Sequence, residues 1–385
     1  MKKQVNTLGF LAVMSMYLIS MGVTVTTPAM AIFAAQFPEN NYALISTLPT
    51  LFVVPASLIC GAIVGKKIKY RTCAILGSAI FLFGGVLPAF VESFNMVLVG
   101  RAILGVGLGI LSPLGNALIL GLYDGQKQAK YLGYGTLLMN AGGIVYQMLG
   151  GQLAGMGWQA VFYGHLFGAI GLIMAFFIPE PEVSPVDANI QQTSSKKEKM
   201  TAAVFIIAGL FCVFNILNYP VMMNLSLLFE TKNAGDAAAA ATALSMYTIA
   251  GCIAGFLYGT IFRILKRFTI SAGYLLCAVG ALLVYAGPSF IIMTLGLCCI
   301  GFGFSLLMPA GLGLVGIHTP PSTVAIGTSV VMALMNMGGF ISTYYLQAVE
   351  AIMGNVIYNS ILIEIVVLAV LAVFFLIYNP YPREK

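Results

Sequence analysis

Two charged residues, Arg101 and Glu364, stand well inside long apolar stretches of the sequence. A buried guanidinium can bind an anion or control the protonation of a nearby carboxylate, and a buried carboxyl can carry a proton because desolvation disfavours its charged form. Glu350, near the end of another apolar stretch, is a second candidate acid. Alternatively, Arg101 bonds neighbouring carbonyls or extends its head toward a polar surface. Charges in such stretches are costly to bury and are therefore candidates for function.

Uncharged polar side chains recur in the same stretches at helical spacing. At 100° per residue, Asn116 falls on the face of Arg101, and Thr343 and Gln347 share a narrow arc with Glu350. Such polar stripes either line a wet path or form interhelical hydrogen bonds, and about half of them are expected to do the latter. The residues predicted to bind a small-molecule substrate are Arg101, Asn116, Asn140, Gln147, Asn215, Asn218, Asn336, Thr343 and Gln347; the candidates for proton coupling are Glu364, Glu350 and Arg101.

The elements that carry these residues must be membrane-spanning helices. Of the 385 residues, 60% are hydrophobic and 8% are charged, and the mean hydropathy is +0.98. An ordinary soluble domain carries about 25% charged residues, so soluble, disordered and collagenous classes are excluded. The apolar runs are 8–35, 43–65, 72–91, 96–120, 131–155, 159–178, 201–228, 238–262, 270–288, 290–314, 324–349 and 356–378. They predict an all-α membrane protein with twelve transmembrane helices.

The basic residues predict how this chain crosses the membrane. With the N-terminus inside, sixteen of the 18 Lys and Arg residues fall on the cytoplasmic side, whereas Lys232 falls outside and Arg101 within a helix. This bias places both termini in the cytoplasm. The net charge of +6 is then a topology signal, and no nucleic-acid partner is expected. The polar segment 181–200 is predicted to be a cytoplasmic linker between six-helix bundles at 1–180 and 201–385.

The two predicted bundles repeat each other in sequence. Gly105, Gly107 and Pro113 recur 196 residues later as Gly301, Gly303 and Pro309, and Met139-Asn140-Ala-Gly142-Gly143 recurs at the same offset as Met335-Asn336-Met-Gly338-Gly339. Gly61 and Gly65 return as Gly255 and Gly259, where small residues would let helices approach closely. Parallel repeats predict two pseudo-symmetric bundles with a central substrate site between them.

No pattern in the sequence predicts an enzyme, a cofactor or a metal. The seven cysteines lack the spacing of a metal site or of an extracellular disulfide framework, so they are expected to be small buried apolar residues. Gly105-x-Gly107-x-Gly109 lies inside an apolar helix with no strand before it, which argues against a dinucleotide loop. A phosphate-binding loop for ATP is also missing from the sequence.

Over essentially its whole length, the sequence resembles the major facilitator superfamily. In that family the loop between helices two and three reads Gly, three residues, an acid, a basic residue, one residue, Gly and two basic residues. Gly61, Lys66 and Lys69 match this loop, whereas Gly65 replaces the acid and Ile68 replaces the second Gly. The acid of the family's usual salt-bridge latch is therefore replaced here.

A closer resemblance is to the twelve-helix drug:proton antiporters. Arg101, Gly105 and Gly107 match their helix-four pattern. Gly133, Gly142, Gly150 and Gly151 match their helix-five pattern, with Tyr146-Gln147 in place of its Gly-Pro. The resemblance implies that helix four lines the cavity, whereas helices six and twelve, which carry His165 and Glu364, are peripheral. His165 is accordingly expected to be structural.

Together, these features predict a monomeric secondary transporter in the cytoplasmic membrane that works by alternating access. The first hypothesis is proton-coupled efflux of amphipathic or drug-like compounds. The alternative is uptake or exchange of a small organic anion, a carboxylate recognised by Arg101. The expected partners are the small-molecule substrate, a proton or an exchanged anion, and the lipid bilayer.

Overall fold

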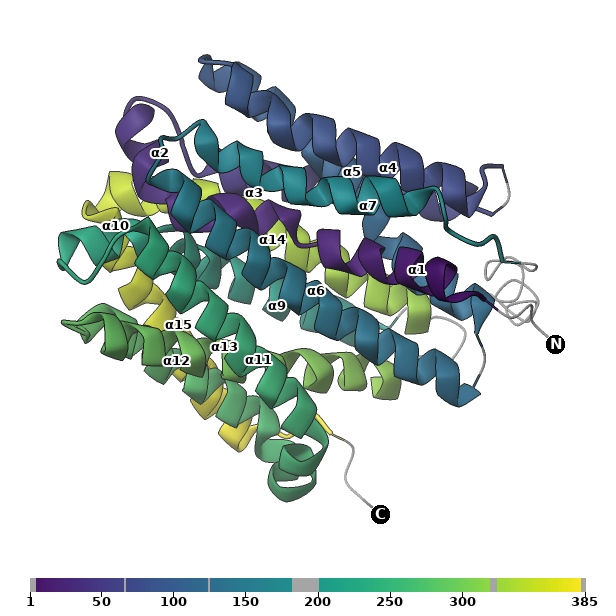
Figure 1. Cartoon of the computed structure of the whole chain (residues 1–385). Helices are drawn as coiled ribbons and strands as arrows, with labels where there is room; N and C mark the ends of the chain where they lie inside the picture. Colours follow the sequence, from purple (N-terminus) through teal and green to yellow (C-terminus); the bar gives the residue numbers. More distant parts are fainter. Residues whose placement is uncertain (1–4, 66, 124, 182–200, 319–323, 382–385) are drawn as a thin grey trace. The chain divides into compact units, whose positions relative to one another are not determined.

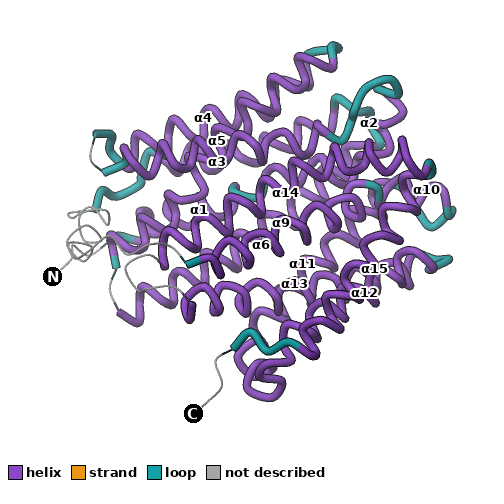
Figure 2. Tube along the Cα trace, turned by 180° about the vertical axis from the view of Figure 1, so that it is seen from behind, coloured by secondary structure: helices purple, strands orange, loops and turns teal. Residues whose placement is uncertain are grey.

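The computed structural model describes all residues except 1–4, 66, 124, 182–200, 319–323 and 382–385. The described residues form helices joined by loops and turns (Figure 1). They contain no strand (Figure 2), and their one β-type contact is an isolated bridge between Val64 and Ile68. The chain divides into two compact units, residues 1–196 and 197–385. Apart from residue 181, the predicted linker 181–200 lies outside the described residues.

The first unit contains one group of helices centred on α5, which contacts α3 and α4, and a second group built around α6. Its elements are α1 (Thr7–Ile19), η1 (Gly22–Ala29), α2 (Met30–Gln36), α3 (Leu44–Ile63), α4 (Tyr70–Val86), η2 (Leu87–Phe90), α5 (Phe94–Leu122), α6 (Gly125–Ala154), η3 (Ala160–Gly168) and α7 (Ala169–Ala175). α5 packs against α3 and α4, and α6 packs against α1 and η1. The run expected at 8–35 is broken into α1, η1 and α2; Pro28, which has no N–H to donate, lies within η1.

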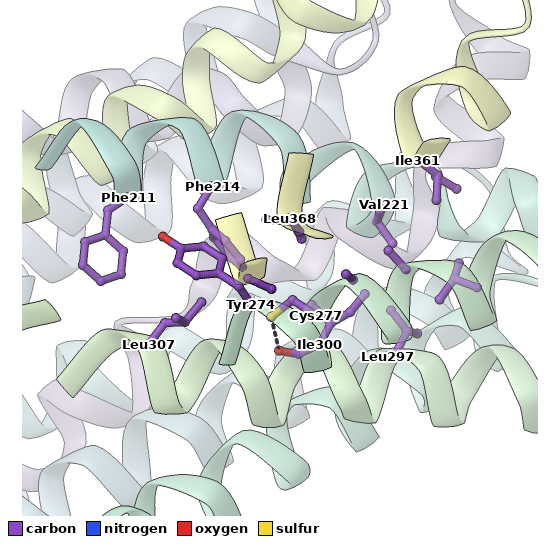
Figure 3. Close-up of a cluster of buried hydrophobic side chains, with 14 of the residues drawn as sticks. Phe211, Phe214, Val221, Tyr274, Cys277, Leu297, Ile300, Leu307, Ile361 and Leu368 are labelled. Carbon is purple, nitrogen blue, oxygen red and sulfur yellow. Dashed lines mark hydrogen bonds between the residues drawn. The ribbon is translucent and has the colours of Figure 1, made fainter. Parts of the chain in front are cut away.

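The second unit is built on two helix groups that share α15. Its elements are α9 (Ala202–Met223), α10 (Leu225–Thr231), α11 (Ala237–Leu265), η4 (Lys266–Phe268), α12 (Thr269–Ala286), α13 (Phe290–His318), α14 (Val324–Met353) and α15 (Val356–Ile377). α13 packs against α11 and α12, α14 packs against α9, and α15 packs against α12 and α9. Figure 3 shows the apolar core between these helices, in which the Cys277 thiol donates to the Ile300 carbonyl at 3.5 Å.

The glycines of the sequence repeat make the same kind of backbone contact in each unit. A Cβ at Gly105 of α5 would overlap the Pro49 carbonyl oxygen in α3, and a Cβ at Gly301 of α13 would overlap the Tyr247 carbonyl oxygen in α11. Likewise, Gly142 of α6 lies against the backbone of Leu18, and Gly338 of α14 lies against that of Cys212. Only glycine allows these helices to approach so closely, so the repeated sequence corresponds to repeated packing.

The close approach expected at a second set of glycines is not found. A Cβ at Gly61, Gly255 or Gly259 would meet no atom within 4 Å, so these positions do not hold helices together. Gly65 has a φ of 75°, a left-handed conformation that suits glycine in the turn before α4. Lys69 is the residue before α4, and Lys66 lies outside the described residues.

Nine helical segments within the described residues are long and apolar enough to cross a membrane. One of them, Ala237–Ala286, contains both α11 and α12, which the sequence separates into two runs. The chain is therefore a multi-pass integral membrane protein. The count of twelve crossings and the cytoplasmic position of the termini stay predictions.

Candidate functional site

Arg101 lies in the interior of the first unit, where its side chain is 0% exposed. From α5, its Nε donates to the Ile45 carbonyl at 2.5 Å and its Nη2 donates to the Thr26 hydroxyl at 3.3 Å. Its Nη1 lies 3.2 Å from Nε2 of His165. The Thr26 hydroxyl is also 2.8 Å from that of Ser46. A carbonyl, a hydroxyl and an imidazole thus surround the guanidinium, and none of these partners carries a negative charge.

His165 is the functional candidate that sequence reasoning missed. It is 0% exposed in η3, and its Nδ1 lies 3.0 Å from the Phe162 carbonyl oxygen. Its ring packs against those of Phe81 and Tyr146, with centroid separations of 5.9 and 6.5 Å. The imidazole thus contacts Arg101, the cation buried among the described helices of this unit, and the expected structural role of His165 stays a prediction. Its neighbours could not be read from the spacing of the sequence.

Glu364 lies in the interior of the second unit, and its side chain is also 0% exposed. Its Oε1 accepts a hydrogen bond of 3.0 Å from the Asn218 amide of α9. Its Oε2 is buried and has no hydrogen-bond partner among the described residues. Tyr247 of α11 and Cys277 of α12 are close enough to interact with the carboxyl electrostatically. Glu364 therefore faces inward among several helices, rather than outward as a peripheral helix would suggest.

The remaining polar candidates differ in their accessibility. Gln147, Asn215, Asn218 and Thr343 are buried, Asn140 and Asn336 are half-buried, and Asn116, Gln347 and Glu350 are exposed. Asn215 and Asn336 each donate to a carbonyl four residues earlier in their own helix, at 2.9 Å. Asn116 accepts a 2.6 Å hydrogen bond from the Tyr17 hydroxyl. Of the residues predicted to bind substrate or protons, Asn218 is hydrogen-bonded to Glu364. Arg101 is hydrogen-bonded to residues that were not predicted, namely Ile45, His165 and Thr26.

The glycines that match the helix-five pattern act in packing. Gly142 and Gly150 of α6 lie against the backbone oxygens of Leu18 and Val25, so α6 runs in direct contact with α1 and η1. Gly151, the residue after Gly150, is also buried. A Cβ at Gly133 of the same helix would meet no atom within 4 Å, so this glycine is not required for packing. In the part of the chain that the structure describes, no group of three His, Cys, Asp or Glu side chains has the arrangement of a metal site.

Comparisons with known proteins agree with this architecture. The model of the family described as "Major Facilitator Superfamily" matches residues 9–343. The methylenomycin A resistance protein of Bacillus subtilis (strain 168) is 30% identical over 124 residues, which cover 31% of this chain and 27% of that protein. The quinolone resistance protein NorA of Staphylococcus aureus (strain Mu50 / ATCC 700699) is 24% identical over 180 residues, covering 46% of this chain and 44% of NorA.

A likeness to solved structures extends over almost the whole chain. The crystal structure of a D-xylose-proton symporter superposes with a TM-score of 0.73 at 16% sequence identity, covering 98% of each chain. At this identity the likeness concerns the fold alone. In sequence, by contrast, the matched segments span less than half of the length of the two resistance proteins.

Proposed function

Because the chain belongs to the major facilitator superfamily of transporters, we propose that it exports amphipathic or drug-like molecules in exchange for protons. The proposal rests chiefly on Glu364, a fully buried acid with one oxygen that has no hydrogen-bond partner among the described residues. The relatives of this chain include proteins named for resistance to methylenomycin A and to quinolones, which supports efflux of such compounds. The 20 methionines supply adaptable apolar side chains that suit a permissive binding surface.

The chemistry of Glu364 supports its role as the proton carrier. A carboxylate buried in an apolar interior needs several donors, and here Asn218 supplies one while Oε2 has none within the described residues. The arrangement therefore favours the neutral, protonated acid in this conformation. Release of that proton requires a second conformation in which the carboxylate gains water or another donor. A group whose charge is tolerated in only one of two conformations couples proton release to the transition between them.

Arg101 supports the alternative substrate class. None of its three described partners neutralises its charge, so a small carboxylate could serve as its counterion. Its donors are already engaged and its side chain is 0% exposed, so an anion would have to replace at least one existing hydrogen bond. Uptake or exchange of a small organic anion therefore stands as the second candidate function.

The proposed architecture places these residues in a monomer within the cytoplasmic membrane. It has twelve helices in two bundles, 1–180 and 201–385, with the linker 181–200 and both termini in the cytoplasm. Exposed Asn116 and Gln347 are better placed to meet a substrate than Asn215 and Asn336, whose amides bond their own helices. Alternating access would expose the substrate path to each side in turn.

Transport by the purified full-length protein in proteoliposomes tests the proposal. A proton gradient is imposed across the vesicle membrane, and the movements of ethidium, benzoate and protons are measured together. We expect ethidium to move against the proton flow and to dissipate the pH gradient. Benzoate exchange without proton movement would instead support the anion alternative. Movement of neither probe under any gradient would count against both functions for these substrate classes.

Substitution of the acid tests the coupling. Glu364→Gln keeps the shape and the acceptor for Asn218 but cannot release a proton, so we expect proton-driven ethidium transport to fall by about tenfold or more. Exchange of internal for external ethidium, which needs no net proton movement, should persist. Glu230→Gln, on the exposed end of α10, is the matched control and should transport normally. If Glu350→Gln abolishes coupling and Glu364→Gln does not, exposed Glu350 is the proton carrier.

A further inference from the structure

The contact between Arg101 and His165 assigns a role to the histidine. We propose that His165, in its neutral form with the proton on Nδ1, is a positioning residue for Arg101 and makes the position of that cation sensitive to protons. The pairing itself is independent of the transported substrate. Its consequence for transport rests on the proposed function.

The hydrogen-bond partners determine which form of His165 is present. The Phe162 carbonyl can only accept, so Nδ1, at 3.0 Å, must donate to it. The Arg101 guanidinium can only donate, so Nε2, at 3.2 Å, must accept from it. The neutral Nδ1–H form is the only one that satisfies both contacts. Protonation of Nε2 removes the acceptor and places two cations at hydrogen-bond distance.

Packing prevents the imidazole from moving away from Arg101. A Cβ at Gly85 of α4 would lie 2.6 Å from Cγ of His165, so the ring already rests against that helix. The Phe162 ring is stacked at an interplanar angle of 11° and a centroid separation of 6.4 Å. With the histidine held on these sides, a change in its charge must be accommodated by movement of Arg101 or of a whole helix.

Within the described residues, the other groups that face His165 provide no compensating negative charge. α6 contributes Tyr146, whose buried hydroxyl has no hydrogen-bond partner among the described residues. α4 contributes Phe81 and Gly85, and its titratable residues Tyr70, Arg71 and Cys73 lie at its opposite end. η1, η2 and α7 also pack against η3, and their sequences contain no titratable side chain. Arg101 is thus the charged group that His165 meets.

Protonation would therefore disconnect η3 from α5 while leaving α5 joined to its other neighbours. Arg101 would keep its bonds to the Ile45 carbonyl of α3 and the Thr26 hydroxyl of η1. In a transport cycle, a conformation that admits water to His165 would allow this proton to bind. That conformation would then be favoured at low pH, since a proton shifts an equilibrium toward the state that binds it better.

The protonation state can be measured directly because the chain has only two histidines, His165 and His318. Full-length protein with ¹⁵N-labelled histidine and the substitution His318→Gln leaves a single imidazole for NMR. His318 is exposed near the end of α13 and lies outside the Arg101 contacts, so its replacement should leave them unchanged. We expect the ¹⁵N shifts of neutral Nδ1–H imidazole at about pH 7. An Nε2–H pattern or an imidazolium at that pH would overturn the proposal.

Thermal unfolding of the purified protein gives a second, independent measurement. An unfolded histidine is protonated below about pH 6.5, whereas His165 is neutral in the folded protein, so acid stabilises the unfolded chain. Between about pH 7.5 and pH 5.5 we expect this residue to contribute a fall of about 2–4 °C in the unfolding temperature. His165→Gln, whose amide can replace both contacts at every pH, should lose that contribution. His318→Gln should retain it.

The outcomes separate this proposal from the proposed function. If His165→Gln shows the same fall as the wild type, or if His318→Gln abolishes it, His165 does not make this unit proton-sensitive. In ethidium transport, His165→Gln should flatten the acid side of the pH profile, whereas His165→Phe, which removes the acceptor for Nη1 of Arg101, should lower transport at every pH. If neither the wild type nor any variant moves ethidium, the proposed export fails while the NMR and unfolding results still decide the pairing.

Discussion

Asn218 supplies the described hydrogen bond to the buried Glu364 carboxyl, at 3.0 Å. Asn218→Leu removes this donor and leaves the carboxyl in an apolar setting, so we expect a loss of about 1–3 kcal/mol in stability. The charged acid is harmed more than the neutral one, so proton release should become harder and proton-driven ethidium transport should slow. Measurement of transport against pH checks this expectation, with the active range moving to higher pH.

Asn215→Leu is the matched control for that substitution, one helical turn earlier in α9. Its amide bonds the Phe211 carbonyl of its own helix at 2.9 Å and does not hold the acid. We expect the pH profile of Asn215→Leu to match that of the wild type, even if substrate affinity changes. Equal shifts of the pH profile in both variants would show that the Asn218 contact has no specific effect on Glu364.

The sequence identified the two buried charges but could not identify what surrounds them. Arg101 and Glu364 stand out because charges are rare in apolar runs. Their partners come from distant segments: Asn218 is 146 positions from Glu364, and Ile45 is 56 positions from Arg101. His165 lies in η3, a 3₁₀ segment with about three residues per turn. The α-helical rotation of 100° per residue therefore does not predict the direction in which its side chain points.

At the scale of the helix, the glycines of α6 predict a sharp contrast between two substitutions. Gly142→Ala would drive a Cβ into the Leu18 carbonyl oxygen, whereas Gly133→Ala would meet no atom within 4 Å. We expect Gly142→Ala to lower the unfolding temperature by several degrees, corresponding to about 2–3 kcal/mol from overpacking against α1. Gly133→Ala should be neutral or stabilising by up to about 1 kcal/mol, because alanine favours helix. Similar melting curves for the two variants would contradict the close contact.

The end of α12 is held by a lysine from the segment that follows α10. Lys232 donates to the carbonyls of Val284, Tyr285 and Gly287 at 3.2, 2.5 and 3.0 Å. Partial burial lowers the pKa of its amine, so these oxygens and the negative end of the helix dipole must help to retain the charge. We expect Lys232→Met to lower stability by about 1–3 kcal/mol. Exposed Lys127→Met is the control, and an equal loss there would contradict this specific role.

The apolar runs located the helices better than they located the breaks within helices and the contacts between them. The run 8–35 is continuous in hydropathy, yet Gly22 begins η1 and the chain resumes as α2 only at Met30. The spacing of Gly61 and Gly65 is the same as that of many helix contacts, but a Cβ at Gly61 would meet nothing. The sequence shows where glycines stand, but the path of the neighbouring helix decides whether a larger residue would fit at each of them.

At the scale of the whole molecule, the distribution of charge makes a prediction about topology. Lys232 is the single basic residue expected outside, and its loop, with Asn233 in a left-handed turn at φ 52°, connects α10 to α11. Sixteen other basic residues are expected in the cytoplasm, together with both termini. Alkaline phosphatase is active only outside the cytoplasm of a bacterial cell, so inserting it after Asn233 should give activity, whereas fusing it to Lys385 should not.

A green fluorescent protein fused to Lys385 serves as the converse reporter, because it fluoresces when it folds in the cytoplasm. Fluorescence at Lys385 combined with phosphatase activity after Asn233 requires an odd number of crossings between the two positions. Five helices, α11 to α15, lie between them, and a single crossing by each of the five gives the odd number that the prediction requires. Phosphatase activity at both positions would require an even number of crossings, so at least one of these five helices would not span the bilayer.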